Sequence, residues 1–342
     1  VKMRRLLRSR AGLAFALLAD LLLYAGDHGP YDYTASSFEI ALAAQERLTS
    51  DWLTLDGVVG TAIGVDGSGH AVLKVYLTAP GIALLPRFVG VEVVPEVTGP
   101  FLALPTSDDD EARADPTQGF ERPVPIGVST GHPQVSAGTI GARVTDGARA
   151  FALSNNHIVA ASNGGQEGDP LLQPGKVDGG RDPDDAIGTL YDFEPLRFCE
   201  TSGCAPNQID AALALTTPDE LGSATPEGGY GSPRTRTVEA TLGLGVQKYG
   251  RTTGLTVGRV TGIHATIDVG YRNGSARFED QIVISGKGFS AGGDSGSLIV
   301  TKGVLLGDRR PVGLLFAGAT ATTLANPIDL VLDRFGVRID GN

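Results

Sequence analysis

The chain has 342 residues, of which 41% are hydrophobic and 20% are charged, and its formal net charge is −11. This length and balance fit a folded protein with a large core and a second, smaller unit. The negative charge argues against nucleic-acid binding, which requires clustered Lys and Arg, and a protein or peptide is the expected partner. The 48 Gly and 20 Pro residues indicate frequent turns and favour an all-β body.

Residues 1–35 have some features of a targeting segment. Basic residues precede an apolar stretch over 11–25; they are Lys2, Arg4, Arg5, Arg8 and Arg10. Asp20 interrupts the apolar stretch, and no small-x-small cleavage site follows it. A signal segment and a basic N-terminal helix therefore remain alternatives, and the protein is expected to be either cytoplasmic or secreted. No other stretch approaches the roughly 20 apolar residues of a membrane span, so no integral span is expected.

Residues 36–104 are predicted to form a small α+β domain. Apolar residues at three- and four-residue spacing predict a helix, and two apolar runs around an Asp-Gly-Ser-Gly turn predict a β-hairpin. The expected elements are a helix from Ser36 to about Asp56, hairpin strands over 58–65 and 71–77, and a strand over 89–97. Residues 105–122 are predicted to be an exposed acidic linker, because Asp108 begins a run of acidic side chains.

Residues 123–342 are predicted to form one large unit of short strands. Apolar segments alternate with Gly-rich turns, which is typical of a barrel or a pair of barrels. The expected strands are 138–144, 150–154, 187–191, 211–215, 246–249, 255–263, 281–284, 297–300 and 312–316. The interval between 157 and 210 is rich in proline and is predicted to be mostly loop, and Pro327 could start a short C-terminal helix over 328–335.

The two cysteines, Cys199 and Cys204, are separated by four residues. They could close a small disulfide at a hairpin tip or remain two free thiols. A zinc site would need further soft ligands, and no other Cys or His is close in sequence. No metal and no cofactor are therefore expected.

The strongest chemical signal is the segment Gly292-Gly293-Asp294-Ser295-Gly296, which leads directly into an apolar strand. Its glycines allow a tight turn. In such a turn the backbone N–H groups of Gly293 and Ser295 can point together at a developing oxyanion, while the Ser295 hydroxyl is presented at the same place. The segment predicts a nucleophilic serine with its own oxyanion hole.

A nucleophilic serine requires a base, and His157 is the best placed of the five histidines. It follows the strand that ends at Ser154 and precedes a short apolar segment. The other histidines lie in the N-terminal segment, in turns or in a strand, where solvated or structural roles are expected; they are His28, His70, His132 and His264.

The base in turn requires a buried carboxylate that fixes its tautomer. Asp210 fits best, because it heads the apolar segment 211–215, where an unpartnered carboxylate would be costly. Asp185 is the alternative, although it follows His157 by only 185 − 157 = 28 residues.

The order of His157, Asp210 and the Gly-Asp-Ser-Gly segment resembles the chymotrypsin/trypsin-like serine peptidase superfamily. The segments 248–256 and 314–318 further resemble bacterial trypsin-like proteins related to the plant narrow-leaf serine peptidases. The resemblance covers about residues 120–336 well and the first domain loosely. It implies an all-β double β-barrel preceded by a small α+β domain, and a serine endopeptidase whose catalytic triad is His157, Asp210 and Ser295.

The resemblance also implies that the two barrels meet at the active site, where Phe289 and residues 316–319 would shape the specificity pocket. Nothing acidic is present there, so a preference for an apolar or small side chain is expected over one for Arg or Lys. No activation sequence with an Ile-Val start precedes the barrel. Asp294 is therefore expected to find an arginine or backbone partner in place of a newly cut N-terminus.

Two other interpretations compete with this one. The segment Gly127-Val128-Ser129-Thr130-Gly131 matches the nucleophile elbow of α/β-hydrolases, but the neighbouring prolines do not fit the strand and helix that an elbow requires. The more serious rival is a protein-interaction module that keeps the fold and the triad but has little or no catalytic activity. Labelling of an activated serine would separate this rival from an enzyme.

Overall fold

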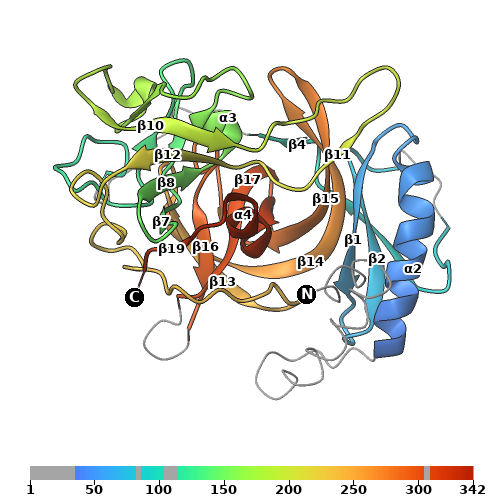
Figure 1. The fold of residues 1–342 in the computed structure, drawn as a ribbon. Helices are drawn as coiled ribbons and strands as arrows, with labels where there is room; N and C mark the ends of the chain where they lie inside the picture. Colours follow the sequence, from blue (N-terminus) through green and yellow to red (C-terminus); the bar gives the residue numbers. More distant parts are fainter. Residues whose placement is uncertain (1–34, 82–85, 104–114, 304–308, 342) are drawn as a thin grey trace, which may run out of the picture.

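The computed structural model describes residues 35–81, 86–103, 115–303 and 309–341. The N-terminal segment and most of the predicted acidic linker lie outside these ranges. Within them, no helix is both long and apolar enough to cross a membrane. Figure 1 shows two strand-rich bodies side by side, with helix α2 on the outer flank of one of them.

The first body is a six-stranded sheet that curls around a hydrophobic core. Its order is β19 (Arg338–Ile339), β7 (Ala142–Thr145), β8 (Ala150–Ser154), β12 (Ala212–Thr216), β10 (Ala186–Phe193) and β9 (Pro170–Leu172). Every residue of β8 is buried, because both of its faces are covered, and its sequence is correspondingly apolar. A short pair, β5 (Ser129–Thr130) and β6 (Gly138–Thr139), and the one-turn helix α3 (Asn156–Val159) lie beside this sheet.

The second body is a closed barrel. Its strands follow the order β15 (Gly274–Ser285), β18 (Thr322–Pro327), β17 (Pro311–Ala319), β16 (Leu298–Thr301), β13 (Gly245–Gly250) and β14 (Gly254–Tyr271). An additional pairing between β14 and β15 completes the ring and leaves no free edge within it. Helix α4 (Ile328–Phe335) follows β18, and β11 (Pro206–Asn207) pairs with β15.

The N-terminal unit extends the sheet of the second barrel. It consists of α2 (Ala35–Trp52), β1 (Val58–Val65), β2 (Ala71–Leu77), β3 (Val93–Val97) and β4 (Phe101–Leu102). Strand β1 pairs with β14 in an antiparallel ladder that includes Gly60 opposite Ile267. Helix α2 packs on this sheet, and its buried residue Trp52 belongs to the same core cluster as Val260 of β14 and Ile282 of β15.

The all-β double barrel with a small α+β unit before it is confirmed, and each predicted strand segment overlaps a strand in the structure. The prediction missed the length of the β14–β15 hairpin, which continues through residues that were not assigned to any strand. The pattern is broken there by bulges in which His264 and Asp280 adopt positive φ angles of 50° and 62°. The interval from 157 to 210 contains all of β9, β10 and β11, in addition to loops.

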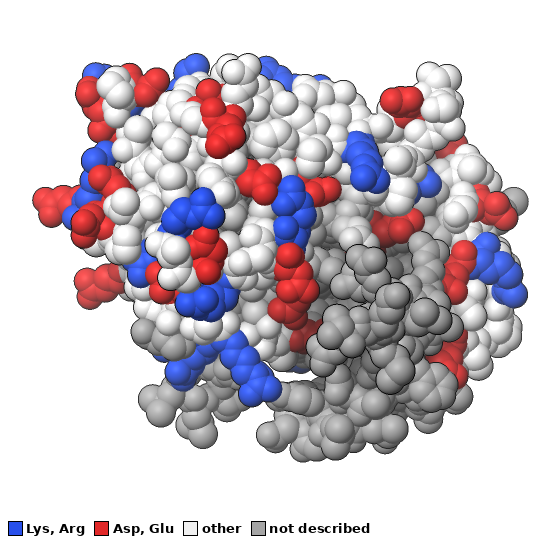
Figure 2. All heavy atoms as spheres, viewed as in Figure 1, with Lys and Arg blue, Asp and Glu red and all other residues white. Residues whose placement is uncertain are grey.

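The structure decides between the two possibilities for the cysteines. Cys199 and Cys204 form a disulfide that closes a short hairpin, in which Glu200 and Gly203 form a β-bridge. Figure 2 shows that acidic and basic side chains lie interspersed on one face of the molecule. Arg334, for example, pairs with both Asp192 and Glu194, so its charge is locally compensated.

Candidate active site

The imidazole of His157 and the carboxylate of Asp210 form a close pair. His157 Nδ1 lies 2.6 Å from Asp210 Oδ2, and the backbone N–H of His157 donates to Asp210 Oδ1 at 3.2 Å. A carboxylate that accepts from Nδ1–H leaves Nε2 as the basic nitrogen. Nε2 is buried and has no hydrogen-bond partner among the described residues. This nitrogen can therefore accept a proton.

Two asparagines hold the backbone of Asp210, whose side chain is fully buried. Asn155, at the N-cap position of helix α3, donates from Nδ2 to the Asp210 carbonyl at 2.7 Å. Asn326, in β18 of the second barrel, accepts from the Asp210 N–H at 3.1 Å and donates to Gln281 Oε1 at 2.7 Å. Neither asparagine was predicted. Asn155 is close to His157 in sequence, whereas nothing in the sequence indicates Asn326.

Ser295 lies in a tight turn against the strand that leads to His157. Gly293 and Gly296 have φ angles of 94° and 95°, which favour glycine. A Cβ on Gly296 would clash with Ser154 Oγ and the Thr139 carbonyl, so the turn is in direct contact with the end of β8. The predicted nucleophile and the predicted base thus lie in adjoining segments of the two barrels.

The two backbone donors of the predicted oxyanion hole are not engaged elsewhere among the described residues, whereas the Ser295 hydroxyl has a long contact. The backbone N–H groups of Gly293 and Ser295 donate no hydrogen bond to the residues that the structure describes. Ser295 Oγ lies 3.4 Å from the carbonyl of Phe316, at the long limit of a hydrogen bond. Ser295 is 1% exposed, so this hydroxyl is shielded from solvent.

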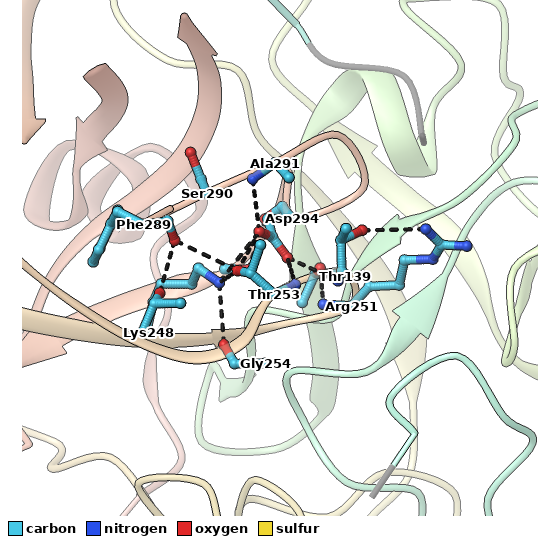
Figure 3. A network of polar contacts seen from close by, with 12 residues as sticks. Thr139, Lys248, Arg251, Thr253, Gly254, Phe289, Ser290, Ala291 and Asp294 are labelled. Atoms are coloured by element: carbon cyan, nitrogen blue, oxygen red, sulfur yellow. Dashed lines mark hydrogen bonds and ion pairs between the residues drawn. The ribbon is translucent and has the colours of Figure 1, made fainter. Parts of the chain in front are cut away.

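Asp294, the residue before Ser295 in the chain, is the centre of a buried polar network (Figure 3). Lys248 Nζ lies 3.2 Å from Asp294 Oδ2, and both side chains are 0% exposed. The backbone N–H groups of Thr252 and Ala291 each donate to the carboxylate at 2.9 Å, and Thr253 Oγ1 donates at 2.7 Å. Burial lowers the pKa of Lys248, while the charge of Asp294 partly opposes this shift.

The expectation for Asp294 was therefore right for the backbone donors and wrong for the cation, which is a lysine and not an arginine. Arg251, the nearby arginine in sequence, pairs with Asp178. Its backbone N–H donates to Thr139 Oγ1 at 3.0 Å, and Thr139 Oγ1 donates to the Gly293 carbonyl at 2.8 Å. The arginine thus supports the same turn from its other side.

Phe289, which the resemblance assigns to the specificity pocket, has its side chain in a hydrophobic core. Its side chain is 1% exposed and belongs to the core of the second barrel, where a Cβ on Gly258 would lie 2.8 Å from its ring. The next residue, Ser290, shares a hydrogen bond of 2.6 Å with Thr323 of β18. The ring of Phe289 is therefore a packing element that anchors the start of the serine loop.

The competing residues have other partners. Asp185 Oδ2 accepts from the backbone N–H of Arg181 at 2.8 Å, away from His157. Ser129 of the hydrolase-like segment is fully buried in β5 and donates to Asp178. His132 pairs with Asp169, and His264 with Asp280. No cluster of three His, Cys, Asp or Glu side chains suited to a metal ion occurs in the part of the chain that the structure describes.

Comparison with known proteins gives one family match and several similar structures. Residues 234–326 match the Nal1 C-terminal domain family. No curated protein matches the chain. Thermobifida fusca protease A is 20% identical, with 64% of this chain and 100% of that chain covered and a TM-score of 0.45.

Two further structures are similar over about the same fraction of this chain. Cellulomonas bogoriensis chymotrypsin is 20% identical, with 65% of this chain and 100% of that chain covered and a TM-score of 0.42. A glutamic-acid-specific serine protease is 18% identical, with 63% and 100% covered and a TM-score of 0.45. The predicted resemblance to narrow-leaf-related proteins is confirmed over 234–326, the segment that contains Lys248, Asp294 and Ser295.

Proposed function

We propose that the protein is a serine endopeptidase that cleaves peptide bonds through an acyl-enzyme. The observation that carries this proposal is the buried Asp210–His157 pair, which leaves the imidazole Nε2 without a partner among the described residues. The Ser295 turn contacts Ser154, three residues before this histidine. A buried base that is oriented by a carboxylate is what a serine nucleophile requires. The His70–Asp66 pair follows a Gly-Ser-Gly turn as well, but its imidazole is 71% exposed and is not a buried base.

Each group has a defined role in the reaction. Ser295 Oγ attacks the peptide carbonyl carbon while its proton passes to His157 Nε2, and the Gly293 and Ser295 N–H groups stabilise the oxyanion. Collapse of the tetrahedral intermediate breaks the C–N bond, and His157 returns the proton to the leaving amine. A water molecule then attacks the ester carbon as its proton passes to His157, the bond to Ser295 Oγ breaks, and His157 returns that proton to Oγ. Asp210 stabilises the imidazolium that forms in both halves.

The oxyanion turn is supported by an internal cation. Because Lys248 balances the charge of Asp294 inside the barrel, the turn does not depend on a free amino terminus for its charge partner. Proton transfer does require Ser295 Oγ to exchange its contact with the Phe316 carbonyl for one with His157 Nε2. Catalytic hydrogen bonds are often long in the free enzyme and shorten when substrate binds.

A fluorophosphonate probe tests the proposal, because it labels an activated serine and leaves an interaction module without one unlabelled. We expect the wild type to be labelled and to hydrolyse peptide substrates. Ser295→Ala should abolish both while the protein remains folded, since the hydroxyl contributes little to packing. Circular dichroism checks the fold. An unlabelled, folded wild type, or cleavage by Ser295→Ala near the wild-type rate, would refute the assignment.

The His157→Ala and Ser295→Ala variants together test whether the two residues act as one unit. Each should reduce turnover by roughly 10⁵- to 10⁶-fold, and the double variant should be scarcely worse than either single variant. Single-turnover hydrolysis of an activated ester measures these losses. Losses that multiply in the double variant would show that the two residues act independently.

A further inference from the structure

A tyrosine from the second barrel contacts the proposed triad. Tyr271, the last residue of β14, donates from its hydroxyl to Asp210 Oδ2 at 2.9 Å. The same oxygen accepts the His157 Nδ1 hydrogen bond at 2.6 Å. Burial, and then the charge of Asp210, raise the pKa of Tyr271 well above its ordinary value, so the phenol stays protonated and remains a donor.

The ring of Tyr271 is held on several sides. It meets the imidazole of His157 edge-on, with 5.8 Å between the ring centroids and an angle of 75° between the planes. Phe198, next to the disulfide, contacts it at 5.7 Å, and Phe278 of β15 contacts it at 6.1 Å. These contacts restrict where the hydroxyl can point, so forming the hydrogen bond to Asp210 costs little additional conformational entropy.

The backbone before Tyr271 is fixed by the N-terminal unit. Strand β4 runs parallel to the end of β14, with Phe101 opposite Val269 and Leu102 opposite Gly270. The N–H of Ala103 donates to the Gly270 carbonyl at 3.0 Å. The segment that closes the N-terminal unit therefore braces the hairpin tip from which the phenol reaches the first barrel.

We propose that Tyr271 is a positioning residue of the triad, whose hydroxyl fixes the Asp210 carboxylate in the orientation that holds His157. The effect of this residue on catalysis rests on the proposed function. His157 contacts both carboxylate oxygens, and the phenol adds a third donor, from the opposite barrel, that further restrains the carboxylate. The tyrosine also joins the N-terminal unit to the reaction centre through β4.

The kinetic test compares Tyr271→Phe with Tyr76→Phe in the full chain. Tyr76 is a matched control, because its hydroxyl is fully buried and has no partner among the described residues. Tyr271→Phe keeps the ring and should lower kcat about tenfold with KM within about twofold, because a hydrogen bond to a charged group is lost. Tyr76→Phe should keep the wild-type kcat. Equal kcat values for Tyr271→Phe and the wild type would overturn the proposal.

A spectroscopic test does not depend on turnover. The proton between His157 Nδ1 and Asp210 is observed by ¹H NMR as a downfield resonance, assigned by its loss in His157→Ala. In Tyr271→Phe it should move further downfield, because an oxygen that loses one donor becomes a better acceptor for the other. A resonance at the wild-type position in Tyr271→Phe would overturn the proposal, and movement in Tyr76→Phe would do the same.

The two proposals fail in different ways. A wild type that is not labelled by the fluorophosphonate, but whose Nδ1 resonance moves in Tyr271→Phe, would refute the peptidase and leave the positioning contact intact. A labelled wild type whose kcat and resonance are both unchanged in Tyr271→Phe would refute the role of Tyr271 alone.

Discussion

The candidate site contains two buried carboxylates, and their surroundings differ. Asp294 is paired with Lys248, a cation that is buried with it. Asp210 has the imidazole of His157 and the phenol of Tyr271, and no lysine or arginine of the described chain lies within ion-pair distance. The charge of Asp294 is thus balanced by a lysine within the folded barrel, whereas Asp210 has only His157 as a possible cationic partner. The Asp294 site is suited to holding the backbone of the turn in place. The Asp210 site is suited to stabilising the positive charge that forms on His157 during a reaction.

The largest expected effect that separates the two carboxylates is on turnover. Asp210→Asn should keep the structure but present the wrong imidazole tautomer to Ser295, and turnover should fall by about 10⁴-fold at neutral pH. The loss should be partly relieved at high pH, where hydroxide can replace the poorly oriented base. Ester hydrolysis from about pH 6 to pH 10 measures both effects.

Asp185→Asn is the matched control for this prediction. Its carboxylate accepts from the Arg181 backbone and has no contact with His157, so its turnover should stay near the wild-type value. A strongly impaired Asp185→Asn variant beside a nearly normal Asp210→Asn variant would transfer the orienting role to the loop after His157.

The Asp294 site should be revealed by its effect on stability. Lys248→Met leaves a buried, unpaired carboxylate, and we expect the free energy of unfolding to fall by about 3–5 kcal/mol. The double variant Lys248→Met, Asp294→Asn removes both charges and should recover at least half of that loss, because a buried ion pair can be replaced by neutral groups at small cost. Urea unfolding followed by tryptophan fluorescence gives these values. Additive losses would mean that the two charges are not coupled.

The smallest expected effect is a difference between the pH dependence of activity and the pH dependence of stability. Since burial lowers the pKa of Lys248, the lysine loses its proton at a lower pH than an ordinary lysine, and the oxyanion turn then loses its cation. Activity should therefore fall as pH rises through the folded-state pKa.

The stability contribution of the same group has the opposite sign. Between the folded-state and the unfolded-state pKa of Lys248, the unfolded chain binds the proton more tightly, so stability from this group rises with pH. From pH 7 to pH 11 the rate of fluorophosphonate labelling should fall, while the contribution of Lys248 to the urea midpoint should rise. Lys248→Arg keeps its charge throughout this range and should lack the alkaline decline in labelling. A decline that persists unchanged in Lys248→Arg would assign it to another group.

The residues proposed as the triad could be predicted from the sequence because each one carries a local signal. Ser295 is surrounded by glycines that a tight turn requires, His157 follows a largely apolar strand, and Asp210 precedes another. A carboxylate at the head of a buried strand needs a partner, and this need can be recognised without knowing the fold. The strands themselves were predicted for the same reason, since short apolar runs between glycines are a local pattern.

Only the tertiary structure decided which partners meet. Tyr271 is 61 residues from Asp210, and Asn326 is 116 residues from it, and no pattern near either residue points to a carboxylate. Lys248 and Arg251 lie in one short segment, yet the lysine pairs with Asp294 and the arginine with Asp178. A sequence can show that a buried charge needs a partner. The identity of that partner depends on which distant strands are brought side by side, and that is set by the closure of the barrels and by the pairing of β1 and β4 with β14.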